Sequence, residues 1–252
     1  SLYRQVLEKI ADPVDRGQPL FNYIVTYFGH WNYPLNDARP NRITASSSVD
    51  EVSSYANTMY YKSAELMTFL ENLQARDPDA IIVLFGDHLP FMGENYSAYV
   101  ESGVLASKRS DFSADMYRFY VSTPVIIIDG TRGPLKTGDL AIYQIPAIVL
   151  GLLHINGPAI MDYTQAPEGM QVRPLPGLHI DLLADGSVEV CKEPPFSQPC
   201  QVSTRWLQDV LVVNDDLFIG QQFTRQVPYH SEMTAVSTPP SGPHTSGSLT
   251  ER

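Results

Sequence analysis

The 252-residue sequence is poor in positive charge, in cysteine and in long apolar runs. Lys and Arg number 17 against 28 Asp and Glu, so the formal net charge is −11. This shortage of basic residues excludes the basic footprint that supplies most nucleic-acid affinity. No run of about 18 consecutive apolar residues occurs, so the sequence itself holds no candidate membrane span. Its first residues also lack the basic start and apolar run of a secretory signal peptide.

Several motifs that would name a chemistry are missing as well. The sequence has no Gly-x-x-x-x-Gly-Lys phosphate loop and no Gly-x-Ser-x-Gly nucleophile turn. Neither cysteine has a histidine nearby in sequence, so a thiol nucleophile has no support. What is present is an apolar share of 43% and a charged share of 18%, which are those of a globular protein. The length suits one large domain or two small ones.

The two cysteines, Cys191 and Cys200, are separated by a turn-rich segment that allows them to meet. A disulfide closing so short a loop would contribute about 2–3 kcal/mol. Two free thiols in a reducing compartment are the alternative. We favour the disulfide, because a close pair in a polar loop suits neither a core nor a metal site, and it would indicate an oxidising compartment.

Apolar runs alternate with helical patterns through the first 153 residues. Three runs predict buried strands, at 21–28, 80–85 and 124–128. Apolar spacings of three and four predict helices at 1–10, 52–73 and 140–153. This alternation indicates an α/β fold with a mostly parallel sheet sandwiched by helices. Ligands of such sheets bind at the carboxyl ends of the strands.

The C-terminal third has a different pattern. Asp185-Gly186 lies between two alternating segments, which predicts a hairpin. Residues 206–223 predict a helix or an edge strand. We divide the chain into an α/β part at 1–176, a hairpin and closing segment at 177–227, and a tail at 228–252 that its composition marks as disordered.

Asp87 and His88 directly follow the strand predicted at 80–85, after a glycine that permits a sharp turn. Carboxylate oxygen and imidazole nitrogen are ligands that suit zinc or manganese. We interpret the pair as metal ligands. The alternative is a turn cap at Asp87 beside an incidental surface His88.

His30 follows the strand predicted at 21–28, again after a glycine. An imidazole there could bind a phosphoryl oxygen or assist a leaving group. The alternative is a surface histidine packed against Trp31 and Tyr33. Because parallel strands would bring His30 and Asp87-His88 to the same sheet edge, we favour the functional interpretation.

Three segments then resemble a known family: Phe-Asn-Tyr-Ile-Val-Thr-Tyr-Phe-Gly-His-Trp-Asn-Tyr-Pro at 21–34, Tyr-Ala-Asn-Thr-Met-Tyr-Tyr-Lys-Ser-Ala-Glu-Leu at 55–66 and Ile-Val-Leu-Phe-Gly-Asp-His-Leu-Pro at 82–90. Together they resemble the C-terminal part of a sulfatase-type catalytic domain in the alkaline phosphatase superfamily. The branch that they resemble most is the lipoteichoic acid synthase and phosphoglycerol transferase group.

The resemblance implies a role for each matching residue. Asp87 and His88 would be metal ligands, for Mn or Zn with Mg and Ca as further options. His30 would be catalytic and, with Trp31, would bind the substrate. The threonine nucleophile and the remaining ligands are expected upstream of Ser1, so this chain by itself is expected to be inactive.

The implied reaction moves a phosphoglycerol or phosphoethanolamine group from a phospholipid to a cell-envelope glycan or glycolipid, through a phospho-threonine intermediate. The implied location is the cell membrane, reached through upstream helices, with the catalytic domain facing the periplasm or the cell exterior. A sulfatase or phosphodiesterase that uses water as acceptor is the first alternative. A non-catalytic binding or accessory module is the second.

Overall fold

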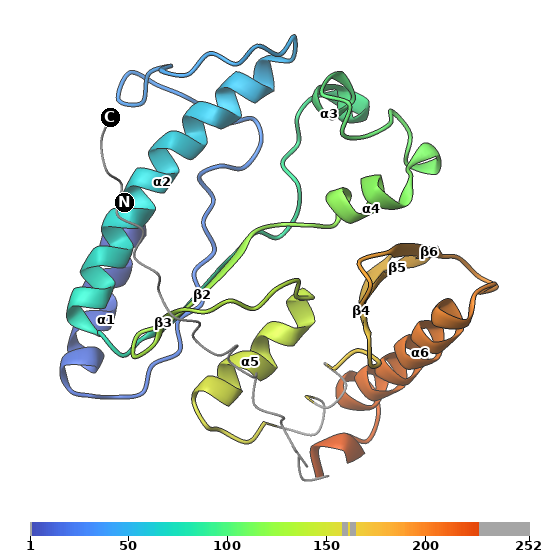
Figure 1. Cartoon of the computed structure of the whole chain (residues 1–252). Helices are drawn as coiled ribbons and strands as arrows, with labels where there is room; N and C mark the ends of the chain where they lie inside the picture. Colours follow the sequence, from blue (N-terminus) through green and yellow to red (C-terminus); the bar gives the residue numbers. More distant parts are fainter. Residues whose placement is uncertain (1, 158–160, 162–164, 227–252) are drawn as a thin grey trace, which may run out of the picture.

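A computed structural model describes residues 2–157, 161 and 165–226. The tail predicted at 228–252 lies outside the described residues. The helices are α1 (Leu2–Asp15), α2 (Asp50–Arg76), α3 (Ser97–Glu101), α4 (Ala114–Tyr120), α5 (Ile145–Leu152) and α6 (Gln198–Phe218). The strands are β1 (Ile81–Phe85), β2 (Val125–Asp129), β3 (Gly133–Pro134), β4 (Met170–Leu175), β5 (Leu178–Leu183) and β6 (Val188–Cys191). Figure 1 shows their arrangement along the chain.

The first sheet has the order β1-β2-β3 and lies beside the helix pair α1 and α2 (Figure 1). Its core is centred on Phe69, Leu70 and Ile82, so the apolar stripe of α2 covers the apolar run of β1. This part confirms the helices predicted at 1–10 and 52–73 and the strands predicted at 80–85 and 124–128, each within a few residues except at the C-terminal end of α1.

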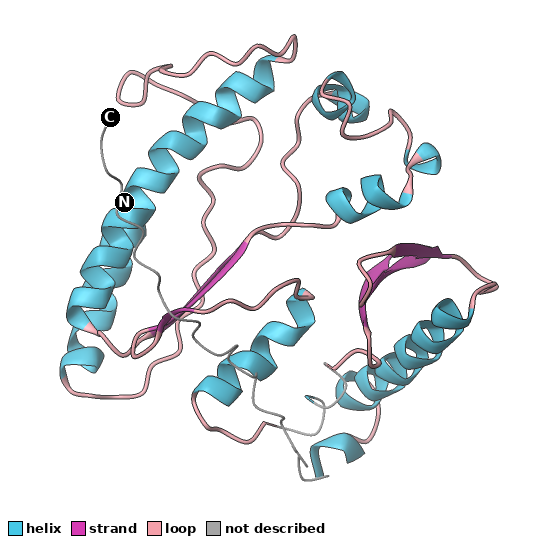
Figure 2. Ribbon diagram, viewed as in Figure 1, coloured by secondary structure: helices cyan, strands magenta, loops and turns pink. Residues whose placement is uncertain are grey.

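The predicted direction of these strands is wrong. β1 pairs with β2 antiparallel, with Ile81 opposite Asp129 and Phe85 opposite Val125. Both three-stranded sheets that the described residues form are antiparallel, and Figure 2 shows them as two separate ribbons. Helices and strands do alternate as in an α/β protein, but a run of apolar residues indicates burial and carries no information on direction.

The strand predicted at 21–28 is absent as well. This segment has no ladder partner among the described residues. Its odd-numbered side chains are exposed, Phe21 by 86% and Tyr27 by 80%, whereas Ile24 packs against the core of α2 and β1. An apolar run becomes a strand only where a second strand takes up its backbone hydrogen bonds.

The second sheet, β4-β5-β6, packs with α6. It confirms the hairpin, since Leu183 and Ser187 are joined by a backbone hydrogen bond across Asp185-Gly186. It also confirms the disulfide, which ties Cys191 at the end of β6 to Cys200 in the first turn of α6. The segment predicted as helix or edge strand at 206–223 is helical as far as Phe218, and its helix begins earlier, after the Ser197 cap.

The second sheet is joined to the rest by a shared core. Ile180 of β5 is completely buried and belongs to a cluster with Leu105, Phe112 and Tyr117 from the region of α3 and α4. Since β4, which precedes residue 177, is paired with β5 along its whole length, the hairpin sheet starts upstream of the segment 177–227.

Candidate functional site

Asp87 and His88 lie at the end of β1, on a turn that is fixed to the start of β2. The Gly86 amide donates to the Pro124 carbonyl at 3.1 Å, and the Thr123 hydroxyl donates to the Gly86 carbonyl at 2.8 Å. Beyond this anchor both side chains point outward, with 82% of the Asp87 side chain and 69% of the His88 side chain exposed. The structure therefore places the predicted ligand pair where a metal ion and a substrate can reach it.

The ring of His88 is oriented as in a metal ligand. Its Nδ1 lies 2.7 Å from the Leu89 carbonyl oxygen, which can only accept, so Nδ1 carries the proton. In the neutral ring Nε2 then carries the lone pair, and it lies 3.6 Å from Asp87 Oδ2. Metal-binding histidines commonly donate their other ring N–H to a carbonyl in this way. One nitrogen and one carboxylate oxygen side by side fit a divalent cation.

His30 and Trp31 lie on a neighbouring loop at 29–33. His30 Nδ1 lies 2.9 Å from the Trp31 carbonyl oxygen, so its Nε2 is also left as the free nitrogen, and its ring stacks on Tyr27. Trp31 is 49% exposed and makes an edge contact with Phe91. His30 and Trp31 are thus both accessible to a ligand.

Phe91 joins this loop to the turn of Asp87 and His88. The buried Tyr33 donates a 2.6 Å hydrogen bond to the Phe91 carbonyl, and its burial raises the pKa of its hydroxyl to about 12. Trp31 contacts the Phe91 ring from the same loop. The structure therefore brings the loops 29–33 and 86–91 together, although the strands that were predicted to do so do not pair.

Lys62 of α2 is a site residue that the sequence reasoning missed. A Cβ atom on Gly29 would lie 3.2 Å from Lys62 Nζ, so the ammonium sits directly against the loop of His30. Burial lowers the pKa of Lys62, and the charge of Asp87 opposes that shift. A cation thus lies between the two loops. The sequence could have indicated this residue, because Lys62 lies on the same helical stripe as Leu66, Phe69 and Leu73, where an apolar residue is expected.

Two other clusters of metal-binding side chains lie in the second sheet, among the residues that the structure describes. One combines His179, Asp181 and Cys191, and the other combines Glu189, Cys191 and Cys200. Both depend on sulfur atoms that the disulfide joins to each other, so neither offers a thiolate to a metal. Asp87 and His88 remain the better candidates.

Comparison with known proteins identifies the family. Residues 1–150 match the family model of the sulfatases. The chain belongs to the sulfatase family. Members of this family are enzymes of the alkaline phosphatase superfamily and generally use a divalent metal, which agrees with the donor pair at Asp87 and His88.

A relative of this sulfatase-family chain is a "Putative cyclic beta-1,2-glucan modification protein" of Rhizobium meliloti (strain 1021). The two are 29% identical over 143 residues, which cover 54% of this chain and 21% of that protein. The chain thus spans about a fifth of the length of the relative that it matches. None of the helices in the described part of the chain has the length and apolar character needed to cross a membrane.

Proposed function

We propose that this chain is part of a metal-dependent transferase that moves a phosphoglycerol or phosphoethanolamine group from a phospholipid to a glycan or glycolipid of the cell envelope. The observation that carries the proposal is the contact between the loop 29–33, which holds His30, and the segment 86–91, which holds Asp87 and His88. The ammonium of Lys62 lies against the first loop and interacts with the charge of Asp87. The resemblance to the phosphoglycerol transferase group and the name of the bacterial relative support a glycan acceptor.

Each residue has a defined part in this proposal. Asp87 and His88 Nε2 would hold the metal, and a bound divalent cation would supply Lewis acidity to a phosphodiester and to a nucleophilic hydroxyl. As an imidazolium, with a proton on both ring nitrogens, His30 would donate from Nε2 to the transferred group or protonate the leaving alcohol. The ammonium of Lys62 balances the negative charge of the phosphoryl group. Because the protein as a whole is acidic, this positive charge has to be supplied within the site. Trp31 offers an exposed ring to the head group. The threonine that carries the phosphoryl group in such enzymes is expected outside this chain.

A hydrolase of the same superfamily is the second candidate. The exposure of Asp87 and His88 favours it, because water has free access to their side chains. The reaction would use the same residues and differ only in the group that accepts the phosphoryl moiety.

We also propose that the site works at the outer face of the cell membrane. The disulfide between Cys191 and Cys200 supports this location, since such bonds persist in oxidising compartments. Phospholipid head groups and envelope glycans are both present there.

The test uses the full-length protein with Asp87→Asn and, as a matched control, Asp79→Asn, which removes an exposed carboxylate at the other end of β1. Metal content is measured by elemental analysis, and head-group release from a phospholipid is followed with and without a glucan acceptor. Asp87→Asn is expected to lose metal and at least about a hundredfold in turnover, whereas Asp79→Asn keeps both. Unchanged metal content in Asp87→Asn would show that the ligand assignment is wrong.

The acceptor decides between the two reactions. A transferase releases the head group onto the glucan and turns over slowly in water alone. If the parent protein releases the head group at the same rate with and without glucan, and no glucan is modified, the hydrolase is the correct assignment.

A further inference from the structure

A cavity of about 900 Å³ opens beside Asp87 and His88. It lies between the turn after β1, the aromatic residues of the α3 and α4 region, the residues that precede α5, and the strands β4 and β5. Its volume is in the range of small-molecule binding sites. Since the candidate metal ligands Asp87 and His88 are only two of its lining residues, the cavity has room for a second molecule next to the proposed site of phosphoryl transfer.

Arg173 of β4 lines this cavity, and one of its hydrogen-bond donors is unpaired within the described part of the chain. Its Nη1 is buried and has no hydrogen-bond partner among the described residues. Burial lowers the pKa of the guanidinium, and the charge of Asp139 opposes that shift. A buried donor without an acceptor is costly, so such a group is expected to be satisfied by a ligand.

The charges around the cavity argue against an anion at Arg173. Besides Arg173, the charged side chains that line it are the carboxylates of Asp87 and Asp139, and Asp139 already accepts a 2.9 Å hydrogen bond from Arg118. An anion on Arg173 would face both carboxylates. A neutral ligand that is rich in hydroxyl groups can accept from the guanidinium and donate to the carboxylates.

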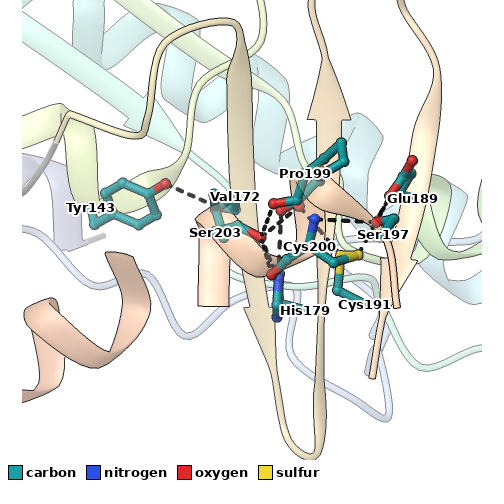
Figure 3. Close-up of polar contacts among 10 residues, drawn as sticks. Tyr143, Val172, His179, Glu189, Cys191, Ser197, Pro199, Cys200 and Ser203 are labelled. Carbon is teal, nitrogen blue, oxygen red and sulfur yellow. Dashed lines mark hydrogen bonds and ion pairs between the residues drawn. A yellow bond between two sulfur atoms is a disulfide. The ribbon is translucent and has the colours of Figure 1, made fainter. Parts of the chain in front are cut away.

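The rest of the lining suits the faces of sugar rings. Four half-buried tyrosines border the cavity: Tyr96, Tyr99, Tyr120 and Tyr143. The hydroxyl of Tyr99 donates to the Pro90 carbonyl at 2.6 Å. The hydroxyl of Tyr143 donates to the Val172 carbonyl at 2.9 Å, as Figure 3 shows. With these hydroxyls engaged by the backbone, the two rings present apolar surface, on which the C–H face of a sugar can pack.

We propose that this cavity binds a glucose oligosaccharide as the acceptor, with Arg173 donating to its hydroxyl groups and the tyrosine rings packing against its faces. The identification of this ligand as the acceptor rests on the function proposed above. The binding itself does not, and it can be measured without turnover.

The test measures binding of linear β-1,2-linked glucotetraose to the full-length protein by isothermal titration calorimetry. Arg173→Gln is expected to weaken binding about tenfold or more, the cost of a hydrogen bond to a charged group. Arg205→Gln, an exposed arginine on α6, is the matched control and is expected to bind as the parent does. Ile142→Arg adds bulk at a cavity-lining position that is 55% exposed, so it blocks the cavity with little effect on folding.

The outcomes separate this proposal from the reaction. Arg173-dependent glucotetraose binding by a protein that transfers nothing would support the cavity and contradict the proposed function. The cavity proposal is overturned if glucotetraose does not bind, or if Arg173→Gln and Ile142→Arg both bind it as tightly as the parent. It is equally overturned if inorganic phosphate, and not the sugar, binds in an Arg173-dependent manner.

Discussion

Asp181 of β5 gives a sharp test of the structure, because its carboxyl group is completely buried. The Ser203 hydroxyl donates to its Oδ2 at 2.6 Å, while Oδ1 is buried without a hydrogen-bond partner among the described residues. Burial raises the pKa of Asp181 from 3.8 to about 6, and nearby Glu189 adds to that shift. Ser203 also contacts His179 Nε2 at 2.7 Å, so the group lies in a closed polar cluster beside the disulfide (Figure 3).

The raised pKa has a definite consequence for stability. Between about pH 4 and about pH 6 the folded protein holds a proton on Asp181 that the unfolded chain has already released. Stability from this group is therefore fully present below about pH 4 and is lost as the pH rises to about 6. A shift of about two units corresponds to about 3 kcal/mol of destabilisation at neutral pH.

Asp181→Asn removes the buried charge and keeps an oxygen that can accept from Ser203. The variant is expected to be more stable than the parent near neutral pH by up to about 3 kcal/mol, or about 2–4 °C in Tm for each kcal/mol in a chain of this length. At about pH 4 the two proteins should melt together. Because all other groups titrate in both proteins, the difference between their melting curves, followed by circular dichroism, isolates Asp181.

Asp185→Asn in the hairpin turn is the control, because the pKa of Asp185 is shifted in the opposite direction. Hydrogen bonds from Ser187 lower the pKa of the exposed Asp185, so its contribution is present near neutral pH and is lost on acidification. Asp185→Asn should therefore gain nothing near neutral pH. The reasoning on burial is refuted if Asp181→Asn is less stable than the parent near neutral pH, or if their difference does not change with pH.

Three further predictions concern other parts of the chain. Lys62→Met in the full-length protein should lower head-group release by about a hundredfold, whereas the exposed Lys108→Met should not, in a head-group release assay. Cys191→Ser should cost about 2–3 kcal/mol in urea unfolding, and the difference should vanish under reducing conditions. Gly130→Ala should destabilise by about 1–3 kcal/mol in the same assay, because its Cβ would lie 2.0 Å from the Pro78 carbonyl oxygen.

The elements that sequence reasoning predicted well are those with local causes. The helix around 52–73 follows from apolar spacing, the hairpin from Asp185-Gly186, and the disulfide from two cysteines around a turn-rich loop. The orientation of His88 is local too, because its ring is set by the carbonyl of the next residue.

The elements that it missed depend on contacts between distant segments. An apolar run does not record whether its neighbour runs parallel or antiparallel, nor, at 21–28, whether a neighbour is present at all. The sheet edge was therefore mispredicted, and yet the loop that holds His30 still contacts the segment that follows Asp87 and His88. The reason is that side chains, and not the strands, carry the contact: Trp31 and Tyr33 both reach Phe91.

Lys62 and Arg173 show how a half-buried cation could be recognised earlier. Lys62 lies on the inner, apolar stripe of α2, and Arg173 lines the cavity from the strand β4 with its Nη1 buried. Removing such a basic group from water costs free energy, and folding alone does not offset that cost. Such a residue persists when the missing partner is a ligand, and both of these cations lie against the same candidate site, Lys62 beside Asp87 and Arg173 in the cavity next to it. A half-buried basic residue therefore indicates the position of the site better than the exposed charged residues of this acidic chain do.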